Sequence, residues 1–261
     1  MTSIKAKTTK GKIESSARFS VAPMMDWTDR HCRYFHRKFT KRALLYTEMV
    51  AAAALIQGKA YHLLDYSEEE HPVALQLGGS DPIQLAEAAS IGQSRGYDEI
   101  NLNVGCPSDR VQSGSFGAVL MKNPKLVASC CEAMKKSTSV DITVKCRIGV
   151  DDQDPEQILP EFLNYISNSG IIRVIIHARK AVLKGLSPKE NRDIPPLDHE
   201  LVFRMKEKFP NLHISLNGGV TSLSAVNELL TKGIDGVMIG RSAYQQPTRV
   251  LSEVDRQIFE E

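Results

Sequence analysis

The sequence predicts an α/β fold in which eight parallel strands close into a (β/α)8 barrel. Short β-like runs alternate with longer helical patterns eight times from Phe19 onward, and alternation of this length is typical of a parallel sheet. Runs such as 174–176 and 236–239 are almost wholly apolar, as expected of strands that are buried on both faces. Eight units favour closure into a barrel over an open doubly wound sheet.

Each strand is expected where an apolar run precedes a helical pattern. In chain order, the expected strands are Phe19–Ala22, Leu44–Thr47, Val73–Leu77, Glu99–Val104, Ile142–Lys145, Val174–His177, His213–Leu216 and Gly236–Ile239. The expected helices lie near Asp29–Phe39, Val50–Gln57, Pro82–Arg95, Pro124–Lys136, Glu156–Asn168, Glu200–Phe209, Ser222–Thr231 and Arg249–Phe259. The polar segment Lys180–Leu197 is longer than a usual connection, which indicates a functional or disordered loop.

The composition is that of a soluble globular protein. The chain has 261 residues, of which 42% are hydrophobic and 25% charged, ordinary values for a protein with a full core. No apolar run approaches the roughly 20 residues that a membrane-spanning helix needs. The net charge of +2 excludes a polybasic nucleic-acid wrapper, so any contact with nucleic acid is expected from local patches.

The cysteine pattern bears on metal binding and on compartment. The five cysteines are Cys32, Cys106, Cys130, Cys131 and Cys146. An odd number without a Cys-x-x-Cys pair argues against a disulfide framework and a thiolate metal site, and it favours the cytoplasm. The acidic residues Asp151, Asp152 and Asp154 are interpreted as a solvated loop, so no metal is expected.

The chain is expected to divide into three parts. Residues 1–18 carry five basic residues and one acidic residue. They lack an apolar core, which excludes a secretory signal and predicts a disordered basic tail; an organelle transit peptide, usually richer in arginine, is the alternative. Residues 19–248 form the barrel, because no linker rich in Gly, Pro or Ser interrupts them, and residues 249–261 begin a C-terminal helical segment.

The segment 101–108 is the most informative stretch of the chain. A short apolar strand, 99–104, breaks at Gly105 and leaves Cys106 at its carboxyl end, directly before Pro107. Ligands bind at that end of the strands in α/β barrels, and proline restricts the preceding residue to extended geometry. A thiol on a stiff turn is therefore expected, with a cysteine that packs as a small hydrophobe as the alternative.

Polar side chains gather at the other expected strand ends. In chain order the ends hold Pro23-Met24-Met25, Glu48, Gln76, Asn103 with Cys106, Lys145 with Arg147, His177, Asn217-Gly218-Gly219 and Gly240-Arg241. Structural residues at these places would mostly be small or apolar, and the carboxyl ends of all eight strands meet at one face of a barrel. We therefore expect a single site at that face.

The last two strand ends indicate a phosphate site. Barrels commonly bind phosphate in the loops after strands seven and eight, through glycine amides and a helix N-terminus. Gly218 and Gly219 let the backbone approach an anion closely, and Arg241 adds a charge-assisted contact. The alternative is a pair of tight turns with an ordinary surface arginine.

Lys145 ends the fifth strand in an apolar context, where a partly buried ammonium needs an acceptor or an anion. The polar edge of a flavin, which gains negative charge on reduction, is a fitting partner, and Gln76 has the donor and acceptor to bond the same edge. A Schiff-base lysine is the competing interpretation. His177 closes the sixth strand, where an isolated histidine is more often structural than catalytic.

These residues belong to blocks that match a known family over nearly all of the stretch from Arg18 to Phe259. The blocks begin at Val21, Ala74, Asn101, Val144, His177, Leu186 and Leu216 and read VAPMMDWTD, ALQLGG, NLNVGCPSDR, VKCRIG, HARKA, LSPKENR and LNGG. The chain resembles the flavin-dependent tRNA-dihydrouridine synthases, within them the dihydrouridine synthase A branch.

The resemblance implies an enzyme that reduces uridine to 5,6-dihydrouridine in the D-loop of tRNA, at positions 20 and 20a, with FMN recharged by NADPH. By motif it places Pro23, Met24 and Met25 beside the flavin ring, Gln76 and Lys145 at its polar edge, His177 as a further flavin contact, and Asn217, Gly218, Gly219, Gly240 and Arg241 at the phosphate. Cys106 is the implied proton donor. Asn103, Lys189 and Arg192 match positions that contact tRNA.

One departure from the family keeps two alternatives open. Family members usually continue into a C-terminal helical domain that grips tRNA, whereas this chain ends about one helix past the expected barrel. The alternatives are a truncated, non-catalytic flavin- and tRNA-binding remnant, and an FMN barrel oxidoreductase that acts on a free pyrimidine. The basic loop 186–192 argues against a free pyrimidine. A monomer is expected.

Overall fold

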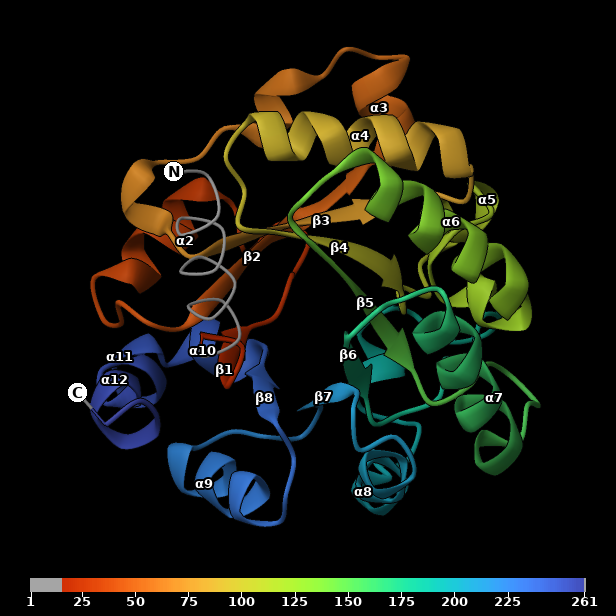
Figure 1. Ribbon diagram of the computed structural model, residues 1–261. Coiled ribbons are helices and arrows are strands. Elements are labelled where there is room, and N and C mark those ends of the chain that lie inside the picture. Colours follow the sequence, from red (N-terminus) through yellow and green to blue (C-terminus); the bar gives the residue numbers. More distant parts are fainter. Residues whose placement is uncertain (1–15, 261) are drawn as a thin grey trace.

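The computed structural model describes residues 16–260, and its eight strands form one closed, parallel barrel (Figure 1). The strands are β1 Phe19–Val21, β2 Leu44–Ala51, β3 Val73–Gly78, β4 Glu99–Val104, β5 Asp141–Arg147, β6 Arg173–His177, β7 His213–Asn217 and β8 Gly236–Ile239. Each strand pairs with the next, and β8 pairs with β1 to close the barrel. The predicted fold class is confirmed.

Helices surround the strands, with α4, α6, α7, α8 and α9 in the outer layer of Figure 1. The α-helices are α2 Arg30–Arg37, α3 Ala52–Ile56, α4 Pro82–Ser94, α5 Asp109–Ser113, α6 Pro124–Ser137, α7 Pro155–Asn168, α8 His199–Lys208, α9 Leu223–Thr231, α10 Arg241–Gln245, α11 Pro247–Leu251 and α12 Val254–Ile258. Short 3₁₀ helices occur at η1 Tyr61–Leu64, η2 Glu68–Glu70, η3 Gly117–Lys122 and η4 Glu190–Arg192. Within the described residues, no helix is long and apolar enough to cross a membrane.

The sequence itself sets where three outer helices begin. In α4, α6 and α7, an Asp or Asn N-cap precedes a proline at the first helical position. The cap side chain accepts a hydrogen bond from an amide of the first turn, and proline lacks the N–H that would have no partner there. Asp81, for example, accepts from Ile83 N and Gln84 N at 2.8 and 2.9 Å.

Two expected elements differ from the structure. Strand β2 continues to Ala51 through an irregular register between Tyr46 and Met49, so the alanine-rich helix expected from Val50 begins only at Ala52. The single last helix expected near Arg249–Phe259 is instead the pair α11 and α12, which follow α10. Pairing with β3 extends the strand to Ala51, although alanine favours helices, because tertiary contacts readily override intrinsic helix propensity.

The ends of the chain bear on the expected domain boundaries. Most of the expected basic tail, residues 1–18, lies outside the described residues. Ser16 and Ala17 are described and are buried, and Arg18 O accepts from Val237 N at 3.1 Å. The last residues of that range therefore pack on the barrel. At the other end, 249–260 contains helical turns that belong to α11 and α12.

The apolar core has two parts. The larger lies between the strands and the outer helices and includes residues from nearly every element. The smaller lies inside the barrel and consists of Ala22, Leu44, Tyr46, Ala74, Ile175 and Met238, with Met24 packed against it. So small an apolar cluster does not fill the barrel, and the rest of the interior is polar.

Strand β4 supplies much of this polar interior. Its residues are all buried, yet they alternate. Ile100 and its apolar neighbours two and four residues on pack in the outer core. Glu99, Asn101 and Asn103 instead bond to polar side chains of other strands. Side chains two apart on a strand share one face. The expectation of a simply apolar strand was wrong for β4, because its inward face carries only polar groups.

A buried ion pair closes the amino-terminal end of this interior. Glu99 is 0% exposed and pairs with Arg173, which is 3% exposed. The Tyr46 hydroxyl donates to Glu99 Oε1 at 2.7 Å, and Thr143 Oγ1 donates to the same oxygen. Burial and the neighbouring Glu99 raise the pKa of Tyr46, so the phenol stays neutral and acts as a donor.

Removing the charge of Glu99 should destabilise the barrel. Glu99→Gln removes the carboxylate charge from the buried pair with Arg173, and breaking a buried ion pair costs about 3 kcal/mol or more. We expect a loss of that size in the free energy of unfolding, measured by urea denaturation. The control is Glu228→Gln, which breaks the exposed pair with Lys232 and should leave the free energy of unfolding nearly unchanged, because water screens an exposed pair. Equal, small losses in both variants would contradict the role of the buried pair.

Candidate functional site

A cavity of about 1090 Å³ opens at the carboxyl ends of the strands. Residues at or near the carboxyl end of each of the eight strands line it, as a single site at one face of the barrel requires. The predicted residues that line it are Pro23, Met24, Met25, Gln76, Asn103, Cys106, Lys145, His177, Arg192, Asn217, Gly218, Gly219, Gly240 and Arg241. Lys189 is exposed and is not part of the lining.

Gln76 and Asn103 form the floor of the cavity. Asn103 Nδ2 donates to Gln76 Oε1 at 2.8 Å, and Gln76 Nε2 donates to Asn101 Oδ1 at 2.8 Å. Asn101 in turn donates to Thr143 Oγ1 at 2.8 Å, which links the floor to the buried Glu99 pair. One N–H and one lone pair of the Gln76 amide remain for a ligand.

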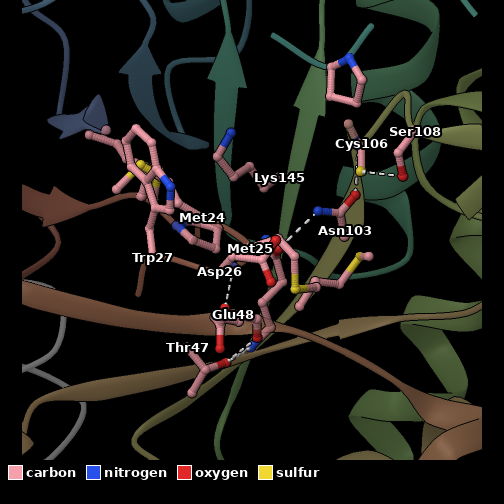
Figure 2. A pocket seen from close by; sticks show the side chains of 18 of the residues that line it. Met24, Met25, Asp26, Trp27, Thr47, Glu48, Asn103, Cys106, Ser108 and Lys145 are labelled. Atoms are coloured by element: carbon pink, nitrogen blue, oxygen red, sulfur yellow. Dashed lines mark hydrogen bonds between the residues drawn. The ribbon is translucent and has the colours of Figure 1, made fainter. Parts of the chain in front are cut away.

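The Cys106 thiol lies on one side of the cavity, and Figure 2 shows it between Asn103 and Ser108. Asn103 Oδ1 accepts from the Cys106 amide at 2.9 Å, and the thiol lies 3.5 Å from Ser108 Oγ. Gly117, at φ +74°, packs directly below: a Cβ there would lie 2.6 Å from Cys106 O. The turn after β4 carries Cys106, and its half-buried thiol lines the cavity; the stiffness expected from Pro107 stays a prediction.

Lys145 projects into the cavity from β5, and Figure 2 shows it between the Cys106 side and the side that holds Met24 and Trp27. Its ammonium donates to Asn217 Oδ1 at 3.0 Å, and Asn217 Nδ2 donates to Met238 O at 2.8 Å. Burial, with Arg147 nearby, lowers the pKa of Lys145 to about 8. A charged ammonium with only a neutral acceptor beside it would gain strongly from an anionic partner.

His177 and the glycines after β7 form one wall. Burial and the cations Arg147 and Lys145 lower the pKa of His177 well below its ordinary value, so the imidazole is neutral. Gly218 has φ +111°, and a Cβ there would lie 2.6 Å from His177 Cδ2. Glycine is therefore required for both backbone conformation and close packing. Gly219 also has a positive φ, +75°.

Positive charge gathers beside the glycine turns. Arg241 pairs with Asp193 at 2.7 and 3.2 Å, so the arginine expected to meet a phosphate is held by a carboxylate. Burial and then Arg241 lower the pKa of Arg192, and the same two causes lower that of Arg179, while Asp193 opposes the shift in both. Asp193 is paired with Arg241, and its single negative charge also acts on Arg179 and Arg192, so the three guanidinium groups leave a net positive charge for an anion.

Several residues of the site were given no individual role from sequence, although Arg147 and Glu48 were named among the polar residues at the strand ends. Arg147 is 4% exposed and binds Gly105 O at 3.1 Å; its place two residues after Lys145 on one strand was the available signal. Burial raises the pKa of Glu48, although the Asp26 amide donates to it. Trp27 stacks on Tyr244 with ring centroids 4.5 Å apart, a contact that no sequence pattern indicated.

Metal binding finds no support in the part of the chain that the structure describes. No group of three or more His, Cys, Asp or Glu side chains that could hold an ion occurs among these residues. The five cysteines are free thiols, and Asp151 is engaged by Lys122 at 2.7 Å.

Comparison with known proteins points to one family. A family model described as dihydrouridine synthase (Dus) matches residues 20–261. The chain is 60% identical over 243 residues to a tRNA-dihydrouridine(20/20a) synthase of Salmonella typhi, covering 93% of this chain and 72% of that protein. It is 59% identical over 251 residues to the enzyme so named from Shigella flexneri, covering 96% and 73%. With that of Vibrio parahaemolyticus it shares 59% over 245 residues, covering 94% and 74%.

The lowered pKa of Lys145 predicts a specific pH dependence of stability. Between about pH 8 and its ordinary 10.5, the unfolded chain holds a proton that the folded chain has lost, so the free energy of unfolding rises with pH. Relative to Lys145→Met, the wild-type apoprotein should gain about 3 kcal/mol across that window. Urea denaturation at a series of pH values measures it. A difference between the wild type and Lys145→Met that stays flat over this pH range would contradict the shift.

Proposed function

The chain belongs to the dihydrouridine synthase family, and from that premise we propose that it reduces uridine to 5,6-dihydrouridine in the D-loop of tRNA, at positions 20 and 20a. The observation that carries the proposal is that one cavity presents both a thiol on a fixed turn and a buried polar floor beside a cationic lysine. Reduction of a C=C bond needs a hydride donor and a proton donor within reach of the same base.

The lining fits FMN as the cofactor. Lys145 and Gln76 offer donors, and one acceptor, to the polar edge of a flavin ring. Pro23, Met24 and Met25 supply an apolar surface for the ring face. The glycine turns with Arg241 and its two neighbouring arginines suit the phosphate, and binding would require Asp193 to share or release Arg241. Neutral His177 is proposed as a further contact.

Cys106 is the proposed proton donor. Bound FMN, recharged by NADPH, would supply the hydride that C6 of the uracil accepts. Negative charge then develops at C5, and the Cys106 thiol protonates that carbon, so that one hydride and one proton saturate the C5–C6 bond. The resulting thiolate regains its proton from solvent. This role needs a neutral thiol, unlike a nucleophilic cysteine. Asn103, which holds the Cys106 amide at 2.9 Å, fixes the direction of the thiol.

tRNA must bring its target base into this cavity. A stacked base is not accessible to the thiol, so the uridine has to be flipped out or already exposed. Lys189 stands exposed beside the cavity residues Pro188 and Arg192. We propose that Lys189 contacts the phosphate backbone at the rim, while Arg192 and Asn103 contact the substrate within the cavity.

The alternatives gain no support from the comparisons. The curated relatives of about 60% identity are named as synthases that act on tRNA, which favours neither a free pyrimidine as substrate nor a Schiff base on Lys145. A non-catalytic remnant would have no need of a fixed thiol and a cationic lysine in one cavity. We propose a cytoplasmic, monomeric enzyme; the free cysteines agree with a reducing compartment.

Replacing the thiol should separate the two halves of the reaction. In Cys106→Ala we expect FMN to remain bound and NADPH to reduce it at the wild-type rate, while dihydrouridine formation falls by a factor of about 10² or more, since general acid catalysis contributes on that order. The measurement is the two-hydrogen mass gain at each uridine of unmodified tRNA.

The matched control is Cys32→Ala, which removes a half-buried thiol on α2 and should leave product yield unchanged. Normal product from Cys106→Ala would contradict the proton-donor role. A wild-type protein that reduces its flavin but converts no tRNA would overturn the proposed function and favour the remnant.

Lys189→Ala should weaken tRNA use without altering the flavin spectrum. Loss of one phosphate contact reduces the slope of log affinity against log salt by about one unit, so the defect should shrink at high salt. The control Lys208→Ala removes an exposed charge from the C-terminal turn of α8. Identical salt slopes for the wild type and Lys189→Ala would contradict a phosphate contact at this residue.

A further inference from the structure

The turn that carries Cys106 has a partner for each of its backbone polar groups. Gly105 N and Cys106 N both donate to Asn103 Oδ1, at 3.1 and 2.9 Å. Cys106 O accepts from Ala118 N at 2.9 Å. The carbonyls of Gly105 and Pro107, on either side of the cysteine, accept instead from two side chains, so the support of the turn does not come from its own strand alone.

Arg147 is the first of these two side chains. Its Nε donates to Gly105 O at 3.1 Å. Its Nη1 donates to Lys180 O at 3.2 Å and to Asn191 O at 2.9 Å. Both acceptors lie in the β6–α8 loop (residues 178–198), so one buried guanidinium joins the amino-terminal side of the cysteine turn to that loop.

Gln112, on α5, is the second. Its Nε2 donates to Pro107 O at 2.7 Å and to Leu183 O at 2.9 Å. Leu183 lies in the same β6–α8 loop. The backbone on both sides of Cys106 is thus linked by hydrogen bonds to one loop, through a side chain of β5 and a side chain of α5. Contacts within β4 do not explain this arrangement.

The loop is itself ordered around Asn191, which is 0% exposed. The Asn191 carboxamide accepts from Val182 N at 2.7 Å and donates to Val182 O, Leu186 O and Ser187 O at 2.8, 3.1 and 3.3 Å. A buried amide with its hydrogen bonds satisfied holds its surroundings in one arrangement. The next residue, Arg192, lines the cavity.

We propose that Gln112 and Asn191 are positioning residues that couple the β6–α8 loop to the Cys106 thiol. RNA held by this loop, through Arg192 and Lys189, would thereby set the thiol in place against the base. The inference rests on the proposed function for the role of the thiol, but the coupling itself is a property of the hydrogen bonds. A shift of about 1 Å in a reacting group can cost on the order of 10²-fold in rate, so small movements of the loop matter.

The coupling can be tested without any turnover. Asn191 makes no hydrogen bond to Gly105 N or Cys106 N, yet Asn191→Ala should make both amides exchange with solvent about tenfold faster, because the loop no longer holds Gly105 O and Pro107 O in place. Hydrogen exchange on the wild type and the variant measures this. Faster exchange confined to residues 182–192 would overturn the proposal.

A size-matched variant gives a second test that does not depend on how Asn191→Ala folds. Gln112→Glu keeps the shape of the side chain but cannot donate to the Pro107 and Leu183 carbonyls. It should speed exchange at Cys106 N and at the amides of 182–187 together. Gln93→Ala, an exposed glutamine that accepts from the Ser139 amide, is the control and should change neither group.

Kinetics then separate positioning from binding. With pre-reduced FMN enzyme and saturating tRNA, Gln112→Glu should slow single-turnover dihydrouridine formation about tenfold. The half-saturating tRNA concentration and the rate of flavin reduction by NADPH should stay within about twofold of the wild type. Equal changes in the single-turnover rate, the half-saturating tRNA concentration and the rate of flavin reduction would overturn the proposal. No change in any of these three quantities would also overturn it. A wild type without product would count against the proposed function, and hydrogen exchange would still decide the coupling.

Discussion

The structure depends on a line of buried hydrogen bonds that runs along the inside of the barrel from the Glu99–Arg173 pair to the cysteine turn. It passes from Glu99 through Thr143 and Asn101 to Gln76, and then to Asn103. Every member is buried, so each broken link would leave a polar group without water or a partner, which is costly. The line therefore fixes the floor of the cavity and the backbone of the turn together.

The interior of the barrel is polar because the site must stabilise charged groups and also fix the positions of its side chains. The apolar cluster inside is small, and among residues 16–260 the neutral Asn217 is the one acceptor that Lys145 of β5 meets. Its lowered pKa and the neutral state of His177 follow from burial among cations. The protein stabilises this arrangement from outside, through the large core between strands and helices, and a bound anion would complete it.

The β6–α8 loop serves two purposes. Its length and polarity indicated function or disorder, and the hydrogen bonds of Asn191 show a segment with a defined internal structure. Through Arg147 and Gln112 it also supports the turn that follows β4. Arg147 and Gln112, which are far apart in sequence, thus meet on the two sides of Cys106. The loop that we propose to offer cations to tRNA is therefore also the loop that supports the backbone of this cysteine.

The sequence by itself determined the fold class, the place of the site and most of its lining. Strand–helix alternation and the Asp-Pro or Asn-Pro helix starts are local signals. The polar residues Gln76, Asn103 and Lys145, near the carboxyl ends of their strands, lie at one face once the barrel closes. The tertiary structure alone decided that β2 runs on to Ala51, that Arg241 is paired with Asp193, and that Lys189 stands outside the cavity. These outcomes depend on pairings between distant segments. Local patterns fix which face a side chain takes, but only the closed barrel fixes which partner it meets.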